Sequence, residues 1–411
     1  MAAPTPLASV EVIEKEHTLL LRPSSGEPFV LLSLDGEGRW LRAQGREWYA
    51  KRGLDSRVLV KERAGGRWEA RLMSPEEQRA FHRQVHRWIS ELACEAPLHA
   101  WSQRVRDWIE RAAAWTPERL EGEALRHRGV YGRIPILPPD LYNAIVIQAT
   151  RGCSYNRCSF CTFYHGIPFR PLAPAEVENQ IARIKELYGA DLERHLKLFL
   201  GDANALVLSQ HRLELLWEVL ERHFAIDPQA ALGTPRWDER GRLRVEGVYT
   251  FMDAFNTRHK APATLRWLAE HGLRRVYIGM ESGSDRVLRF LTKVGTAQDV
   301  VNAVRAFKAA GIAVGVILLA GAGGRELQEP HIMESAARVN EMGLGPDDAV
   351  FFSPLVVEPG GAWARRASQE GVTPLDAEQI EAEIDAIRAR LRFGPGAPPR
   401  ITRYELREFI H

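Results

Sequence analysis

The sequence contains few cysteines for its length. Only 4 of 411 residues are cysteine, too few for the disulfide framework of a secreted scaffold. Long apolar runs are also absent, since a membrane-spanning helix needs about 20 apolar residues. The longest uncharged stretch, residues 309–324, is shorter than that and carries several glycines. We therefore expect a buried strand flanked by loops there, and a metal site or free thiols rather than disulfides.

An excess of charge of one sign is absent too. The chain has 55 basic and 53 acidic side chains, and this balance gives no argument for binding nucleic acid or an anionic membrane. Residues 1–9 lack the basic segment and apolar run of a secretory signal. Because 45% of the residues are hydrophobic, the chain can form a large core with more than one structural unit. We expect a cytoplasmic protein in a reducing compartment.

The first 125 residues change from a strand pattern to a helix pattern. Apolar runs at residues 17–21, 29–34 and 58–62, separated by Ser-Gly, Asp-Gly and Gly-Gly turns, predict short strands. Apolar side chains then follow helical spacing at 81–92 and 101–109. The tryptophans in these helices are expected on a buried stripe. We therefore predict an N-terminal accessory region over residues 1–125.

From about residue 140 the pattern alternates between strand and helix. The six predicted strands are 144–149, 196–200, 248–251, 276–280, 314–319 and 350–357. Amphipathic helices separate them, and Gly189, Gly272 and Gly311 are expected where three of these helices end. The alternation predicts an α/β fold with a parallel sheet or barrel. We place this core at residues 126–365, followed by a helix-and-strand extension at 366–411.

Three of the four cysteines lie within nine residues, directly after the first core strand. Cys153, Cys158 and Cys161 are close enough in sequence to share one metal centre. Three thiolates leave one position of a four-site centre open for chemistry. A zinc site completed by His165 is an alternative. The fourth cysteine, Cys94, lies close to Leu92 on a predicted helix, and we expect it to be a buried, unreactive thiol.

A strand, a three-cysteine loop and repeated strand–helix units resemble the radical S-adenosylmethionine (SAM) superfamily. The nearest resemblance is to the group of oxygen-independent coproporphyrinogen oxidases and elongator-type enzymes. It implies a partial (β/α)6 barrel, and a [4Fe–4S] cluster bound by Cys153, Cys158 and Cys161. The usual motif of that family is Cys-x3-Cys-x2-Cys. The first gap here has four residues, Ser-Tyr-Asn-Arg, which makes a variant Cys-x4-Cys-x2-Cys motif.

Other segments resemble cofactor-binding motifs of the same superfamily. They are the aromatic position before the third cysteine, the turn after the second strand, the Glu-Ser-Gly sequence ending the fourth, and the glycine turn after the fifth. The resemblance assigns SAM-binding roles to Phe160, Gly201, Asp202, Glu281, Ser282 and Gly321. Tyr164 and His165, just past the cysteines, are candidates to face a substrate. The resemblance assigns no catalytic side chain.

The resemblance implies an enzyme. A reduced cluster would cleave SAM to methionine and a 5′-deoxyadenosyl radical, and the radical would take hydrogen from a substrate that the sequence does not identify. An external donor similar to flavodoxin or ferredoxin would supply the electron. No second cysteine cluster is present, so methylthiolation is not expected. The N-terminal part also lacks the early α/β alternation of a cobalamin-binding domain.

Two other functions stay open at this point. A non-catalytic iron–sulfur or zinc protein, such as an electron carrier, would need a fourth protein ligand. A radical enzyme that modifies RNA would use the N-terminal region to bind RNA. Basic and aromatic residues alternate there: Arg39, Arg42, Arg46, Lys51 and Arg52 with Trp40, Trp48 and Tyr49. Acidic residues are mixed among them, which favours a solvated charged sheet over an RNA surface.

Overall fold

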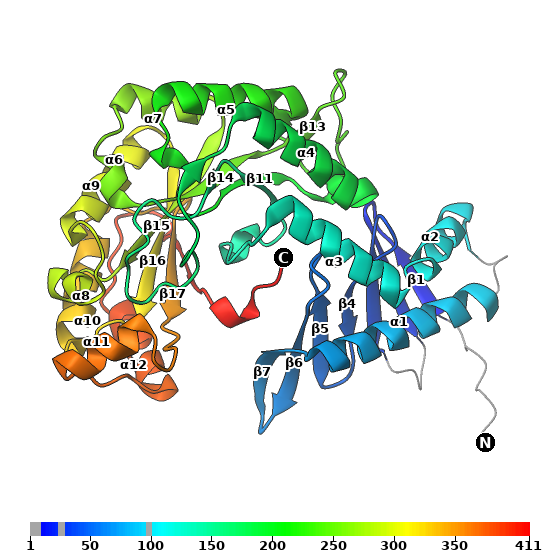
Figure 1. Ribbon diagram of the computed structural model, residues 1–411, viewed down its shortest axis with the longest axis horizontal. Coiled ribbons are helices and arrows are strands. Elements are labelled where there is room, and N and C mark those ends of the chain that lie inside the picture. Colours follow the sequence, from blue (N-terminus) through cyan, green and yellow to red (C-terminus); the bar gives the residue numbers. More distant parts are fainter. Residues whose placement is uncertain (1–9, 24–28, 96–100) are drawn as a thin grey trace.

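The computed structural model describes residues 10–23, 29–95 and 101–411. An antiparallel sheet with its helices forms an N-terminal unit, and a larger parallel α/β core unit lies beside it (Figure 1). The predicted Ser-Gly turn falls within residues 24–28, which lie outside the described residues. None of the described helices combines the length and apolar character that a membrane span requires.

The N-terminal unit is a seven-stranded antiparallel sheet in sequence order. Its strands are β1 (Val10–Glu14), β2 (Thr18–Pro23), β3 (Leu31–Asp35), β4 (Trp40–Gln44), β5 (Trp48–Arg52), β6 (Val58–Ala64) and β7 (Arg67–Leu72). Alternate side chains such as Leu21 and Leu32 pack with apolar residues of α1 (Pro75–Glu95) and α2 (Gln103–Ala113). Trp88 and Trp108 lie in this core, as their helical spacing predicted.

The prediction of a buried thiol at Cys94 is wrong, because its side chain is exposed. Leu92 of the same helix is 1% exposed and lies in the core. With about 3.6 residues per turn, a position two residues further on points to nearly the opposite side of a helix. Proximity to Leu92 in sequence therefore did not place Cys94 in the core.

The core unit is a sheet of seven parallel strands. In spatial order they are β8 (Ile145–Gln148), β11 (Lys197–Gly201), β14 (Gly247–Met252), β15 (Leu273–Glu281), β16 (Ala313–Ala320), β17 (Ala349–Pro354) and β18 (Arg400–Arg403). Each neighbouring pair is parallel. The prediction of a partial α/β barrel is confirmed. The terminal strand, β18, pairs with β17 and is the seventh strand of this same sheet.

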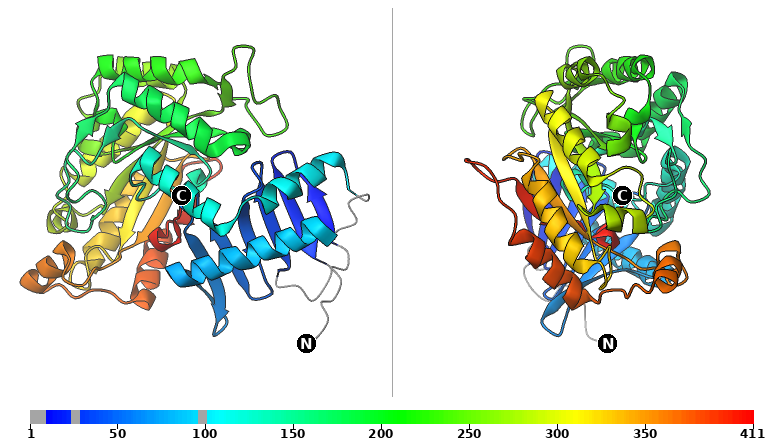
Figure 2. Two further views of the ribbon diagram at one scale, coloured as in Figure 1. Left: turned by 45° about the vertical axis from the view of Figure 1, so that its right-hand side comes forward. Right: turned by 90° about the vertical axis from the view of Figure 1, so that its left-hand side faces the viewer.

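Helices of the core unit pack along the outer side of the curved sheet (Figure 2). The helices after the N-terminal unit are α3 (Pro117–Tyr131), α4 (Pro174–Tyr188), α5 (Gln210–His223), α6 (Ala254–Thr257), α7 (Pro262–Glu270), α8 (Asp285–Phe290), α9 (Ala297–Ala309), α10 (Gln328–Asn340), α11 (Ala362–Glu370) and α12 (Ala377–Arg388). Short strand pairs join β9 (Thr150–Arg151) to β10 (Arg170–Pro171), and β12 (Phe224–Ile226) to β13 (Leu243–Val245). Gly189 follows α4 as predicted, and a capping box of Thr296 and Asp299 opens α9.

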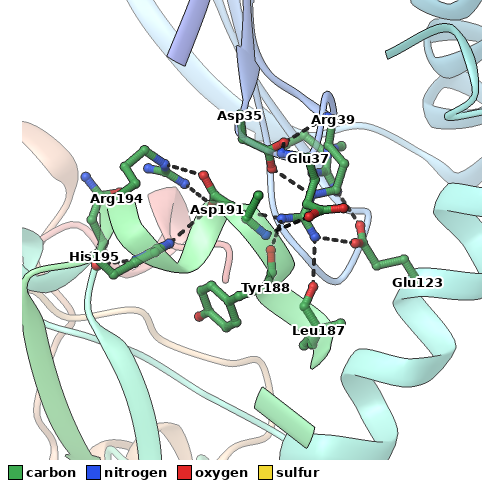
Figure 3. Close-up of polar contacts among 12 residues, drawn as sticks. Asp35, Glu37, Arg39, Glu123, Leu187, Tyr188, Asp191, Arg194 and His195 are labelled. Atoms are coloured by element: carbon green, nitrogen blue, oxygen red, sulfur yellow. Dashed lines mark hydrogen bonds and ion pairs between the residues drawn. The ribbon is translucent and has the colours of Figure 1, made fainter. Parts of the chain in front are cut away.

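A buried ion network joins the two units (Figure 3). Arg39, in the turn between β3 and β4, donates hydrogen bonds to Asp35 Oδ2 at 2.6 Å and to Glu123 Oε1 of α3 at 2.5 Å. It also donates to the carbonyls of Leu187 and Tyr188, at 2.9 and 3.0 Å. These carbonyls end α4, where a helix leaves them without internal partners. The N-terminal unit thus caps the helix that follows the cysteine loop.

The same contacts bear on the idea of an RNA surface at residues 39–52. Arg39 and Arg52 are buried, and both bind the carboxylate of Glu123. Trp40 is 3% exposed, and Trp48 packs against the same apolar core. These four side chains stabilise the fold and are not presented to a nucleic acid.

Candidate cofactor site and active site

A cavity of about 370 Å³ lies where the core strands end. Its wall contains all three clustered cysteines, Cys153, Cys158 and Cys161, together with residues that end or follow β11, β14, β15, β16 and β17. Parallel strands bring their carboxyl ends to one edge of a sheet, which is where α/β folds bind ligands. The topology therefore collects these side chains from distant parts of the chain.

Hydrogen bonds fix the cysteine loop to its surroundings. Tyr155 Oη donates to the Thr292 carbonyl at 2.7 Å, and Asn156 Nδ2 donates to the Tyr164 carbonyl at 2.8 Å. Asn156 lies within the four-residue gap and has a φ of 48°. Asparagine tolerates this left-handed conformation better than most residues, because its short side chain can hydrogen-bond locally. Its backbone N–H also lies 3.4 Å from Cys153 Sγ.

The donor set fits an iron–sulfur cluster. Burial raises the pKa of Cys158 to about 12 and also raises the pKa of Cys161, so these thiols need a cationic partner to ionise. Among the described residues, no three His, Cys, Asp or Glu side chains are placed to hold a single metal ion. In a [4Fe–4S] cluster each thiolate binds its own iron, so the thiolates need not meet at one point. His165 is exposed and does not line the cavity.

An ion pair between Glu281 and Lys293 lies on the cavity wall. Glu281 Oε1 is 2.8 Å from Lys293 Nζ, and the side chains are 9% and 16% exposed. Burial by itself lowers the pKa of Lys293, but the neighbouring charges of Glu281 and Cys158 outweigh it and raise that pKa above its usual value. Lys293 also lies 6.0 Å from the ring centroid of Phe160. The pair thus places a carboxylate, an ammonium and an aromatic ring beside the thiols.

The backbone at the end of β15 orients the Glu281 carboxylate toward this ion pair. Glu281 has a φ of 60°, a region that side chains with a Cβ rarely adopt. The register between β15 and β16 shifts here, as at a β-bulge, which re-aims side chains. A Cβ at Gly279 would lie 2.3 Å from Glu281 Oε1. Glycine at 279 therefore leaves room for the carboxylate.

Two polar residues that the sequence analysis did not assign also line the cavity. Asn204 Nδ2 donates to Asp253 Oδ2 at 2.6 Å, and Asp253 Oδ1 accepts from the Asn256 backbone N–H at 2.8 Å to cap α6. Asn204 Oδ1 has no hydrogen-bond partner within the described part of the chain. No local motif marks these residues, because their proximity arises only when the ends of β11 and β14 come together.

Asp202 lies behind the cavity wall. Its carboxylate accepts hydrogen bonds from Gln148 Nε2 at 2.7 Å and from the Gly152 N–H at 3.0 Å. Burial raises the pKa of Asp202, and these two hydrogen bonds oppose that shift. The side chain therefore anchors the start of the cysteine loop to the end of β11.

The structure brings some of the predicted residues together and separates others. Phe160 and Glu281 line the cavity with the three cysteines, as does Tyr164. The predicted residues outside that lining are Gly201, Asp202, Ser282 and Gly321. Much of the remaining wall is apolar or aromatic, with Phe163, Phe251, Tyr277, Ile317, Leu319, Leu355 and Tyr404. Such a wall excludes water from a reactive centre.

The sequence matches a known family model. The model of the radical SAM superfamily matches residues 147–336. A curated relative, 4′-phospho-dehydrooxetanocin synthase from Priestia megaterium, is 24% identical over 177 residues, which cover 41% of this chain and 22% of that protein. This chain therefore matches less than a quarter of that relative's length.

Two solved structures of radical SAM enzymes show weaker similarity. Coproporphyrinogen III oxidase (HemN) from Escherichia coli has a TM-score of 0.42 and 15% identity, over 65% of this chain and 55% of that one. The radical SAM methyltransferase TsrM from Kitasatospora setae has a TM-score of 0.40 and 20% identity, over 59% and 41%.

The residues matched by the family model include the cysteine loop, Glu281 and Lys293. The cofactors of this family are a [4Fe–4S] cluster and SAM, and the thiol set and cavity described above fit that pair. Residues 147–336, a little under half of the chain, therefore match the radical SAM superfamily.

Proposed function

We propose that this chain is a radical SAM enzyme in which Cys153, Cys158 and Cys161 hold a [4Fe–4S] cluster. The observation that carries the proposal is the meeting of the three thiols with Glu281 and Lys293 in one cavity at the strand ends. Three protein ligands would leave one position of the cluster for SAM. When bound and reduced, the cluster supplies the electron that splits SAM into methionine and a 5′-deoxyadenosyl radical.

The chain's own residues would bind and orient SAM. The Glu281 carboxylate is suited to accept hydrogen bonds from the ammonium or the ribose hydroxyls of SAM. The ion pair with Lys293 fixes the direction of this carboxylate. Phe160 offers a ring face to the adenine. Asp202 would support the site from behind by fixing the cysteine loop, rather than by touching SAM.

The substrate would be a compact organic molecule with apolar surface. A cavity of about 370 Å³ lies in the range of small-molecule sites, and SAM would take part of it. The ionic groups Glu281 and Lys293 pair with each other, and Glu358 accepts a hydrogen bond from Thr162. The aromatic and aliphatic wall would meet the substrate together with Arg407, which also lines the cavity. An external electron donor similar to flavodoxin or ferredoxin would reduce the cluster.

The rival function of electron carrier has no observation in its favour. It requires a fourth protein ligand to close the cluster. The fourth cysteine, Cys94, is exposed on α1 of the N-terminal unit and is not part of the cavity lining. The open iron that distinguishes a radical SAM enzyme from a carrier can be measured directly.

The test is reconstitution of the full chain with iron and sulfide under anaerobic conditions. The reduced protein should give a [4Fe–4S] EPR signal that shifts when SAM is added, and should release 5′-deoxyadenosine. Cys158→Ala should lose the signal and the product, whereas Cys94→Ser should keep both. An EPR spectrum of the cluster that does not change when SAM is added would contradict the proposal. So would a Cys158→Ala protein that still releases 5′-deoxyadenosine.

A further inference from the structure

Three buried polar side chains connect the end of β15 to α12. Ser282 directly follows Glu281, His331 belongs to α10, and Glu383 belongs to α12; none is more than 1% exposed. His331 Nδ1 lies 2.8 Å from Ser282 Oγ, and His331 Nε2 lies 3.4 Å from Glu383 Oε1. We call the Ser282–His331–Glu383 chain the relay. It resembles a hydrolytic triad in composition, but its burial leaves no path for a substrate.

The relay holds backbone rather than substrate. Glu383 Oε1 accepts the Gly321 N–H at 2.6 Å, at the end of β16. Ser282 Oγ accepts the Ser284 N–H at 3.0 Å, in the turn after β15. The turn is also fixed through Gly283, whose N–H donates to Ser335 Oγ of α10 at 2.8 Å. The end of β16 is thus tied to the Glu383 carboxylate, and the turn after β15 is tied to the His331 imidazole.

The hydrogen-bond partners assign the protons in the relay. Because Ser282 Oγ accepts from Ser284, its own proton is available to His331 Nδ1. The remaining ring nitrogen, Nε2, then carries the proton of the imidazole and faces the Glu383 carboxylate. Within the described part of the chain, neither His331 Nε2 nor Glu383 Oε2 has a hydrogen-bond partner, so the imidazole and the carboxylate meet as a 3.4 Å polar contact rather than a hydrogen bond.

The relay lies next to the unusual backbone of Glu281. A left-handed φ in a residue with a Cβ persists only where surrounding contacts fix it. The residues that follow, Ser282 and Gly283, receive those contacts from α10. Gly283 packs so closely there that a Cβ would lie 2.3 Å from the Glu334 carbonyl oxygen. The turn therefore has little freedom to release the strained conformation while the relay is intact.

We propose that His331 and Glu383 are positioning residues for Glu281. They hold the turn that aims the Glu281 carboxylate into the cavity, and so they set the affinity for SAM without touching it. Glu383 lies outside the family-matched residues 147–336, so the C-terminal part of the chain would complete the SAM site. This inference also gives Ser282 and Gly321 a role as anchors instead of cofactor contacts, and it rests on the proposed function.

The test compares His331→Ala and Glu383→Ala with His82→Ala in the full chain. His82 is also buried, at 1% exposure, and lies 3.2 Å from both Trp40 Nε1 and the Ser56 carbonyl oxygen in the N-terminal unit. Three quantities are measured: the dissociation constant for SAM in the cluster-loaded protein, the melting temperature, and amide hydrogen exchange without cofactor. Glu383→Gln serves as the conservative variant, because its amide oxygen can still accept the Gly321 N–H.

The relay variants should bind SAM at least tenfold more weakly, with faster exchange at Ser284 and Gly321. His82→Ala should lower the melting temperature to a similar extent while its SAM affinity stays within twofold of the wild type. Glu383→Gln should recover most of the protection at Gly321. Unchanged exchange at both amides in the relay variants would overturn the positioning role of the relay. A loss of SAM affinity in His82→Ala equal to that in the relay variants would also overturn it. Wild-type protein that binds no SAM, with exchange still increased in the variants, would instead overturn the proposed function.

Discussion

At the scale of single residues, the ion pair of Glu281 and Lys293 lies on the cavity wall, and the sequence assigned a role to only one of its members. Glu281 ends a strand and was predicted from the Glu-Ser-Gly sequence. Lys293 follows α8 and was not predicted, because its role arises from a fold that returns it to the same wall. When one side chain of a mostly buried ion pair is removed, the desolvation penalty of the remaining charge is no longer offset.

Lys293→Met tests the pair. We expect the free energy of unfolding to fall by about 2–5 kcal/mol, because a mostly buried carboxylate loses its cation. SAM affinity should fall as well, since the direction of Glu281 is no longer fixed. Denaturant titration and equilibrium dialysis measure the two effects.

The matched control for this substitution is Arg71→Met. Arg71 pairs with Glu77 at 2.9 Å, but these side chains are 47% and 46% exposed. Such exposed pairs contribute about 0–1 kcal/mol, so the control should unfold almost like the wild type. A Lys293→Met protein as stable as Arg71→Met would show that the cavity pair is not important for the fold.

At the scale of elements, the carboxyl end of β15 combines a left-handed residue, a register shift and two glycines. Gly279 leaves space for the Glu281 carboxylate, and Gly283 leaves space for α10. A strand that ends in this way gives up regular pairing with β16 in order to aim a side chain. The sequence predicted the strand and its acidic end, but not the space that the glycines provide.

Gly279→Ala should therefore disturb the site from within the strand. The new methyl group would lie 2.3 Å from Glu281 Oε1 and 3.1 Å from Lys293 Nζ, so the ion pair must separate or move. We expect weaker SAM binding and a loss of stability, measured by calorimetric titration and thermal unfolding.

Gly122→Ala is the comparison for that variant. A Cβ at Gly122, in α3, would meet no atom within 4 Å. Alanine in a helix interior stabilises a protein by up to about 1 kcal/mol relative to glycine. The control should melt at the same or a higher temperature and bind SAM normally. If both variants bind SAM equally well, Gly279 is not needed for the geometry of the pair.

At the scale of the whole molecule, the N-terminal unit is joined to the core unit through buried charges. Arg39 caps α4 and binds Asp35 and Glu123 at once. The segments 1–125, 126–365 and 366–411 that the sequence suggests as domains remain a proposal. Contacts join these segments. Strand β18 of segment 366–411 pairs with β17 of segment 126–365, and Lys61 of segment 1–125 forms a 2.6 Å ion pair with Glu408.

Arg39→Met should destabilise the whole chain. Loss of the guanidinium leaves the buried carboxylates of Asp35 and Glu123 with fewer partners, and we expect a cost of about 3–5 kcal/mol. Arg42→Met, at an exposed position of the neighbouring strand β4, should change stability by about 0.5 kcal/mol or less. Guanidinium unfolding curves of both variants would show whether the junction is essential, and equal midpoints would contradict that role.

The stability of the chain should also fall in mild acid. Burial, helped by the charge of Arg52, lowers the pKa of His82 to about 4, while an unfolded histidine titrates near 6.5. The unfolded state therefore binds a proton that the folded state resists, and the free energy of unfolding decreases as the pH falls from about 6.5 to about 4. His127, also buried, shifts in the same direction for the same main reason.

Unfolding free energies measured across that pH range check this prediction. His82→Gln cannot take up the proton, so its curve should fall less steeply than that of the wild type. The difference between the two curves should be at most about 3.5 kcal/mol at the acid end, at about 1.4 kcal/mol per pKa unit. Parallel curves would show that His82 does not contribute to the acid sensitivity.

The sequence by itself determined the alternation of strands and helices in the core unit, its parallel sheet and the three-thiol loop, but only three of the seven strands of the N-terminal sheet. Those features are local, because periodic apolar side chains, helix caps and clustered cysteines act over a few residues. Only the tertiary structure decided which polar side chains share the cavity. It brought Lys293, Asn204 and Asp253 to the wall and put Asp202, Ser282 and Gly321 behind it. Such placement depends on which strand ends meet, and residues far apart in the chain carry no local mark of that contact.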